Sequence, residues 1–293
     1  MIKIENVKKS FSNHLVFEDI NLAIEEGSIF GLVGINGAGK STLLRCIAGI
    51  YQADQGTILI NDKDVFDQVD IKKEVFFLPD DPYYFKKMNG RDVKKIYESL
   101  YDMDIEAFHS YIKLFNLSLE MPLYKFSKGM RRRFFISIAF AIKPKYLILD
   151  EAFDGLDPQA RLIFKRVLIE LKTKYQTTII IASHSLRELE DICDTYGLLD
   201  GHHMRLSGHL IEDIEQYRQY QVAFKQPFDQ LIFKDLNILK YNQNKSVAHI
   251  IVKGNKEETI NQLNALNPMF IEELDIDFES LFLLEVEEGA KHV

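Results

Sequence analysis

The first residues of the chain alternate between apolar and polar side chains, which is the pattern of strands with one buried face. Two such runs follow each other, and their apolar positions are Ile2, Ile4, Val7, Ile20, Leu22 and Ile24. Continuous apolar runs at 29–33, 146–150 and 178–181 are instead typical of strands buried on both faces. We therefore predict a pair of strands over 1–27, followed by the buried strands of an α/β core.

The middle of the chain has the three- and four-residue apolar spacing of helices. The positions that show it are Val93, Ile96, Tyr97, Leu100, Phe108, Ile112 and Phe115. We expect the α/β core to span about 28–80 and to resume near residue 145. A mainly helical subdomain at about 86–142 would then be inserted between its two parts.

The last eighty residues have their own succession of short elements. The pattern predicts strands at 220–224, 238–241 and 247–252 with a turn at 242–245, a helix at 260–266, a strand at 269–271 and an amphipathic helix at 278–286. We expect a main domain over 1–212 and a small accessory α+β domain over 213–293. Because this second domain contains no chemical motif, a passive stabilising role is favoured over regulation or dimer contact.

Composition and charge narrow the class of protein. Of the 293 residues, 46% are apolar and 27% charged, which describes a globular protein with a sizeable core. No apolar run approaches the ~20 residues of a membrane-spanning helix, and the first residues lack the apolar stretch of a signal peptide. Cys46 and Cys193 have no metal-ligand spacing and are expected to be buried thiols in a reducing compartment.

The net charge of −8 is carried by the end of the chain, where residues 255–293 contain ten acidic residues and two lysines. The remaining 254 residues carry no net charge, which disfavours binding to duplex DNA. The run RRRFF at 131–135 can be interpreted in two ways: as a basic and aromatic nucleic-acid patch, or as the start of a helix whose later turns are buried.

Residues 34–42, GINGAGKST, stand between the predicted strand at 29–33 and a segment with helical spacing. This is the strand–GxxxxGK[ST]–helix arrangement that binds phosphates. The glycines let backbone N–H groups turn towards the β- and γ-phosphates, and the start of the helix adds positive potential. The predicted nucleotide-binding residues here are Gly34, Asn36, Gly37, Ala38, Gly39, Lys40, Ser41 and Thr42. Lys40 is predicted to reach the terminal phosphates and Ser41 to ligate Mg²⁺.

A second acidic site follows the apolar run at 146–150. Asp150 is predicted to hold Mg²⁺, and Glu151 to polarise the attacking water. A strand that happens to end in acidic residues is a reasonable alternative in isolation. Beside a complete phosphate loop, the catalytic interpretation is favoured.

The order of these motifs and of five others resembles the ATP-binding cassette (ABC) family of ATPases over about residues 1–212. The stretch FSKGM at 126–130 stands at the place of the family's signature, and DGLD at 154–157 at the place of its D-loop. His184 follows a buried strand, as does the family's switch histidine. Phe11 falls where an aromatic ring stacks on adenine, and the stretch FFLPDDPYYF corresponds to the Q-loop.

The resemblance implies a dimer in which two cassettes face each other head to tail. Ser127 and Gly129 would then contact the γ-phosphate held by the phosphate loop of the partner, and Asp157 would belong to the same composite site. RRRFF would begin the helix behind the signature, with Arg133 bonding neighbouring loops. Phe134, Phe135 and Ile138 would lie in the helix core. No nucleic-acid partner is expected.

Some positions depart from the family pattern: Lys128, Met130, Ile138 and Ala152 replace the usual residues, and Asp80 stands where the Q-loop has glutamine. A carboxylate can still accept a hydrogen bond from water and approach a metal ion, so Asp80 is included among the predicted catalytic and Mg²⁺-binding residues. The alternative is that Asp80 and Asp81 only solvate a loop between two prolines.

These departures resemble those of bacterial exporter ATPases with separate membrane subunits. The resemblance implies an ATP- and Mg²⁺-dependent ATPase, peripheral on the cytoplasmic face of the cell membrane. It would act as a dimer, with a homodimer favoured, and drive a separately encoded permease that exports a peptide, antibiotic or lipid-like compound. A soluble cassette protein of translation or DNA maintenance is disfavoured by the single set of motifs and the absence of sustained heptads. A nucleotide-binding regulator is disfavoured because the hydrolytic residues are all present.

Overall fold

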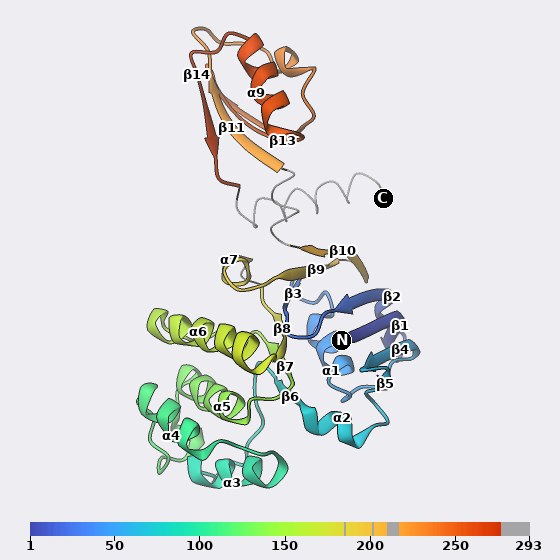
Figure 1. Ribbon diagram of the computed structural model, residues 1–293, viewed down its shortest axis with the longest axis vertical. Helices are drawn as coiled ribbons and strands as arrows, with labels where there is room; N and C mark the ends of the chain where they lie inside the picture. Colours follow the sequence, from blue (N-terminus) through green and yellow to red (C-terminus); the bar gives the residue numbers. More distant parts are fainter. Residues whose placement is uncertain (185, 201, 210–216, 277–293) are drawn as a thin grey trace. The chain divides into compact units, whose positions relative to one another are not determined.

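The computed structural model describes residues 1–184, 186–200, 202–209 and 217–276 (Figure 1). The chain forms two compact units, Met1–Ser207 and Gly208–Val293. The predicted domain boundary at 212/213 and the predicted helix at 278–286 lie outside the described residues. Cys46 and Cys193 are buried free thiols, as the sequence predicts.

A four-stranded antiparallel sheet begins the first unit, in the order β2-β1-β4-β5. Its strands are β1 (Ile2–Phe11), β2 (His14–Ile24), β4 (Gln55–Ile60) and β5 (Lys63–Asp64). The predicted strand pair is confirmed, because β1 and β2 are antiparallel with Ile2 opposite Ile24. The assignment of all of 28–80 to the α/β core is wrong, since β4 pairs with β1 through Ile2 opposite Ile60. The alternating apolar side chains of β4 extend the buried face of β1.

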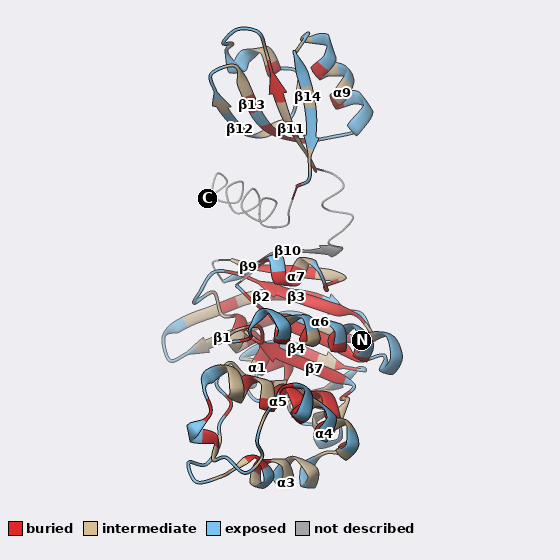
Figure 2. Cartoon of the chain, turned by 90° about the vertical axis from the view of Figure 1, so that its left-hand side faces the viewer, coloured by how far each residue is buried: buried red, intermediate tan, exposed pale blue. Residues whose placement is uncertain are grey.

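A six-stranded, mostly parallel sheet forms the core, in the order β10-β9-β3-β8-β7-β6. Its strands are β3 (Ile29–Val33), β6 (Val75–Leu78), β7 (Tyr146–Asp150), β8 (Thr178–Ala182), β9 (Thr195–Asp200) and β10 (His203–His209). Every residue of β3, β7 and β8 is buried, which explains their continuous apolar sequences. Figure 2 shows β3 and β7 in the colour of buried residues. The neighbours β3, β7 and β8 are parallel, so their carboxyl ends meet at one edge.

Helices pack beside the parallel sheet, and those between residues 90 and 142 form the predicted helical subdomain. The helices are α1 (Lys40–Ile47), α2 (Val69–Glu74), α3 (Gly90–Leu100), α4 (Ile105–Leu114), the short η1 (Leu123–Lys125), α5 (Lys128–Ile142), α6 (Pro158–Tyr175) and α7 (Leu186–Glu190). In Figure 1 the parallel sheet lies between the antiparallel sheet and helices α5 and α6. Phe134, Phe135 and Ile138 of α5 are fully buried, so their predicted place in the helix core is confirmed.

The second unit has a core of its own beneath a sheet of order β12-β13-β11-β14. Its elements are β11 (Tyr217–Ala223), η2 (Gln230–Phe233), β12 (Ile238–Asn244), β13 (Val247–Lys253), α9 (Lys256–Ala265) and β14 (Phe270–Leu274). The predicted hairpin is present, but its turn is shorter than predicted because Asn244 still pairs with Val247. The described part of this unit is therefore α+β, with α9 packed through Leu263.

Candidate nucleotide-binding and hydrolysis site

The phosphate loop connects β3 to α1 at the carboxyl edge of the parallel sheet. Gly39 precedes α1 with a φ of 100°, and a Cβ there would lie 2.8 Å from Cγ1 of Val16, so the position requires glycine. Lys40 is buried, and its Nζ donates hydrogen bonds to the carbonyl oxygens of Gly34 at 2.7 Å and Ile35 at 3.2 Å. The loop thus wraps around a lysine ammonium group.

The other predicted residues of this loop lie at different depths. Gly34 is buried, Asn36 and Gly37 are exposed, and Ala38 and Thr42 are half-buried. Burial lowers the pKa of Lys40, while the Coulombic attraction of two nearby acidic residues opposes that shift. The phosphate loop therefore has exposed backbone at its surface and the positive charge of Lys40 beneath it.

Ser41 and Asp150 come together although they are far apart in the sequence. The Ser41 hydroxyl donates a hydrogen bond to Oδ1 of Asp150 at 3.1 Å. Asp150 ends β7 and is buried, and this burial raises the pKa of its carboxyl group. A hydroxyl and a carboxylate are the hard oxygen donors that Mg²⁺ prefers, so the pair fits that ion.

Glu151 and His184 meet across the ends of β7 and β8. Oε2 of Glu151 lies 2.8 Å from Nδ1 of His184 and accepts a hydrogen bond from the His184 backbone N–H at 3.3 Å. Oε1 of the same carboxylate lies 3.8 Å from Nζ of Lys40. The predicted catalytic glutamate therefore faces both the phosphate loop and the predicted switch histidine.

The signature residues begin α5. Oγ of Ser127 caps this helix by accepting the N–H of Met130 at 3.1 Å. A Cβ at Gly129 would lie 2.3 Å from the carbonyl oxygen of Gly155, so the D-loop packs directly on the signature. Within the described residues, no hydrogen bond or ion pair joins Ser127 or Gly129 to the phosphate loop. Their predicted contact is with a nucleotide held by another subunit.

Asp157 and Phe11 complete the predicted nucleotide contacts. Asp157 caps α6 by accepting the N–H of Ala160 at 2.9 Å. Phe11 is 44% exposed, so it is a surface residue and not part of the core. Its ring centroid lies 5.4 Å from that of Tyr51 in an edge-on contact. Tyr51 lies outside the sequence motifs, so it is not among the residues that the sequence predicts to bind the nucleotide.

The structure adds a residue that the sequence analysis missed. The sequence indicated Arg133 as the arginine that bonds neighbouring loops, and this side chain does approach Asp157 at 3.4 Å. Arg132 makes the more extensive contacts: it is buried and bonds the backbone of both the Q-loop and the end of β7. The sequence offered no signal for this choice, because each arginine of the run lies one helical turn before buried residues of α5.

Asp80 lies beside this arginine. Its Oδ1 accepts a hydrogen bond from Nη2 of Arg132 at 2.7 Å and lies 3.5 Å from Nζ of Lys128. The alternative that Asp80 only solvates a loop does not account for these contacts. The approach of Asp80 to Mg²⁺ and to the attacking water stays a prediction.

Comparison with known proteins identifies the family. The family model described as ABC transporter matches residues 17–154. The lantibiotic transport ATP-binding protein SrtF of Streptococcus pyogenes is 31% identical over 202 residues, covering 68% of this chain and 86% of that protein. The methionine import ATP-binding protein MetN of Clostridium tetani is 31% identical over 224 residues, covering 72% of this chain and 70% of that protein. The chain belongs to the ABC transporter ATP-binding proteins.

Other members of the ABC family extend this similarity. The ABC transporter ATP-binding protein YtrB of Bacillus subtilis is 27% identical over 284 residues, which are 97% of each chain. A solved ATP-binding subunit of an ABC transporter is 25% identical, with a TM-score of 0.67 over 74% of this chain and 92% of that one. A dimeric bacterial ABC cassette at 19% identity shares the fold, with a TM-score of 0.64.

The chain is accordingly an ABC-type ATPase subunit that binds and hydrolyses ATP. ABC subunits dimerise and work with membrane permease subunits. No helix in the described part of this chain is long and apolar enough to cross a membrane.

Proposed function

We propose that this ABC subunit powers the export of a peptide, antibiotic or lipid-like compound through a separately encoded permease. The observation that carries the proposal is an aromatic groove beside the Q-loop, described below, which suits a permease helix. The lantibiotic transport relative supports a peptide as cargo. Relatives named for methionine import and sulfate/thiosulfate import also match, so the direction of transport is what the experiment has to test.

In the proposed reaction, Lys40 and the backbone N–H groups at the start of α1 hold the β- and γ-phosphates of ATP. Ser41 and Asp150 would hold Mg²⁺, which neutralises charge on the phosphates when it is bound. The Lys40 ammonium group is buried under the phosphate loop. It can therefore contact the γ-phosphate of a bound nucleotide while it stays shielded from solvent. These groups bind and orient the nucleotide, and none of them removes a proton.

Proton removal is assigned to Glu151. Its carboxylate is held from one side by the Lys40 ammonium at 3.8 Å and from the other by His184 at 2.8 Å. A carboxylate held in this way can accept a hydrogen bond from the attacking water and orient it in line with the γ-phosphate. His184 is 52% exposed, so it can also contact the nucleotide.

The second half of each site is assigned to another copy of the chain. Ser127 is exposed at the start of the fifteen-residue helix α5, where backbone N–H groups point outward. An anion such as a γ-phosphate is stabilised at such a helix start. Two identical chains arranged head to tail would place each signature opposite the phosphate loop of the partner, so ATP would hold the homodimer closed.

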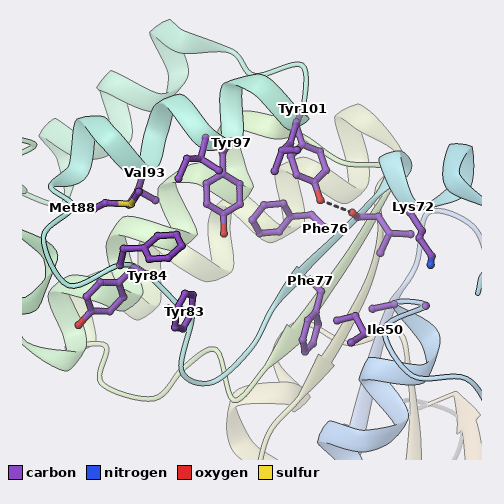
Figure 3. Close-up of a pocket in the computed structure, with 16 residues that line it drawn as sticks. Ile50, Lys72, Phe76, Phe77, Tyr83, Tyr84, Met88, Val93, Tyr97 and Tyr101 are labelled. Atoms are coloured by element: carbon purple, nitrogen blue, oxygen red, sulfur yellow. Dashed lines mark hydrogen bonds between the residues drawn. The ribbon is translucent and has the colours of Figure 1, made fainter.

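The proposed permease surface is a groove of about 590 Å³ between the end of α1, β6, the Q-loop and α3 (Figure 3). Figure 3 shows Phe76, Phe77, Tyr83 and Tyr97 around this groove. Tyr83 is 80% exposed and Phe85 58% exposed. Exposed aromatic residues are enriched at protein interfaces, and an apolar helix of the permease is the occupant that we propose.

The direction of transport can be tested in inside-out membrane vesicles from cells that make the chain together with its permease. Added ATP then reaches the ATPase subunit from outside. We expect ATP-dependent uptake of a fluorescent lantibiotic or a fluorescent phospholipid, and no uptake with the Lys40→Ala chain. ATP-driven loss of a preloaded compound would show import. Failure of both probes to move would contradict the proposed cargo classes.

A further inference from the structure

Arg132 is an unusual core residue. It lies in the first turn and a half of α5, and only 1% of its side chain is exposed. A guanidinium group always carries its charge, so its burial is costly unless every N–H group finds an acceptor. The partners that Arg132 has acquired therefore indicate what the buried charge does.

Those partners belong to two segments that are far apart in the sequence. In the Q-loop, Nη1 donates to the carbonyl oxygen of Pro79 at 2.9 Å, and Nη2 donates to the carbonyl oxygen and to Oδ1 of Asp80 at 2.8 and 2.7 Å. At the end of β7, Nη2 also donates to the carbonyl oxygen of Glu151 at 3.1 Å. One planar group thus joins the Q-loop to the backbone of the catalytic glutamate.

The backbone of Glu151 needs such support. Its φ is 47°, in the left-handed region that residues other than glycine seldom adopt. Its N–H donates to the carbonyl oxygen of Ala182 at 3.0 Å, and its own carbonyl oxygen accepts from Arg132 and from the N–H of Asp154 at 3.1 Å. This conformation directs the carboxylate towards His184 and Lys40. Losing one of these bonds would let Glu151 relax away from that direction.

We propose that Arg132 is a positioning residue for ATP hydrolysis, which holds Glu151 in its left-handed conformation and joins it to the Q-loop through Asp80. In this arrangement, a displacement of the Q-loop or of α5 shifts the carbonyl group of Glu151. Asp80 supplies the negative charge that accompanies the buried arginine, which explains why an acidic residue can stand in this Q-loop. The aromatic groove borders the Q-loop. A helix that binds in the groove and displaces the Q-loop would therefore move Asp80 and Arg132, and through Arg132 the carbonyl group of Glu151.

The test compares Arg132→Lys with wild type in the full chain, using kcat, the KM for ATP and the thermal midpoint. Lysine keeps the charge but cannot donate in two fixed directions. We expect kcat to fall about tenfold or more, since small displacements of a catalytic group have large effects on rate. The KM should change less than threefold. Arg166→Gln, which removes an exposed positive charge from α6, is the control and should keep wild-type kcat.

A second comparison separates positioning from a general loss of structure. In a Glu151→Gln background, Arg132→Lys should change the residual single-turnover rate less than twofold, because the carboxylate through which Arg132 acts is gone. Equal losses of rate in both backgrounds, or a wild-type kcat for Arg132→Lys, would overturn the proposal. If Arg132→Lys does not fold, Asp80→Asn takes its place. It should lower kcat in the wild-type background and not in the Glu151→Gln background, and equal effects in the two would again overturn the proposal.

Discussion

Oε2 of Glu151 lies 2.8 Å from Nδ1 of His184, although the two residues follow different strands of the parallel sheet. Because β7 and β8 are adjacent and parallel, Asp150 pairs with Ala182, and the residues that follow each strand leave the sheet side by side. The catalytic carboxylate and its partner are therefore placed by strand pairing. This relationship leads to the first two predictions.

Glu151→Gln should bind ATP with nearly wild-type affinity and lose turnover by roughly 10²–10⁴-fold, the usual contribution of a general base. The amide keeps the size of the side chain, so the site should remain intact. Phosphate release and ATP binding, measured on the same preparation, check both parts. The variant should also accumulate as an ATP-bound dimer in size-exclusion chromatography. Wild-type turnover would exclude Glu151 as the base.

His184→Ala should lower kcat by about 100-fold, the order of loss expected when a catalytic group is displaced by an ångström. It removes the contact with one side of the Glu151 carboxylate and leaves the phosphate loop unchanged, so ATP affinity should fall much less than kcat. His203→Ala is a control because that histidine lies in β10 and bonds the carbonyl oxygen of Glu18. If the two substitutions had equal effects on kcat, the special role of His184 would be excluded.

Ser127→Arg should bind ATP through its own phosphate loop and fail to form the ATP-dependent dimer, because bulk and charge would block the partner's site. Ser127→Ala is the comparison: it removes the helix cap, at a cost of about 1 kcal/mol in stability, and the proposed hydroxyl contact with the γ-phosphate, but it adds no bulk or charge. It should therefore weaken the ATP-dependent dimer less than Ser127→Arg does. Mixing Ser127→Arg with Lys40→Ala chains should restore part of the turnover, since one composite site would be intact. Dimer formation and turnover by Ser127→Arg alone would contradict the arrangement between subunits.

Phe11→Ala should weaken ATP binding by about 1–3 kcal/mol, the range for stacking between a base and an aromatic ring. Binding of GTP should weaken to a similar extent, because a π-face does not distinguish bases. Phe11→Tyr keeps the ring and should bind ATP as wild type does. Titration calorimetry with both nucleotides gives the comparison. Unchanged affinity in Phe11→Ala would place the adenine elsewhere, with Tyr51 as the next residue to test.

Replacing Tyr83 and Phe85 together by alanine should weaken the association with the permease by more than 1 kcal/mol, as truncation of aromatic interface residues commonly does. ATP binding by the isolated chain should not change, because both residues line the groove, and no residue of the phosphate loop does. Tyr175→Ala, at the end of α6, is the matched control. Affinity can be measured with detergent-solubilised permease, and an unchanged value would exclude the groove as the docking surface.

The sequence by itself was sufficient to predict the phosphate loop, the acidic end of β7 and the buried strands β3, β7 and β8. Each of these depends on residue types at fixed local spacing, because a tight turn needs glycine and a strand buried on both faces needs a continuous apolar run. The side chains predicted for the hydrolysis site come together for a different reason, the pairing of strands. Parallel strands bring Lys40, Asp150 and Glu151 to one edge of the sheet.

Only the tertiary structure decided which sheet β4 and β5 join and which arginine of the RRR run is buried. Strand pairing between β1 and β4 links residues 47 to 58 positions apart, and the short apolar stretch ILI at the end of β4 fits either sheet. Arg131, Arg132 and Arg133 are chemically identical, and the rotation of α5 against the Q-loop selects Arg132 for burial. The left-handed backbone of Glu151, and the bond from Arg132 that supports it, arise from the same long-range packing.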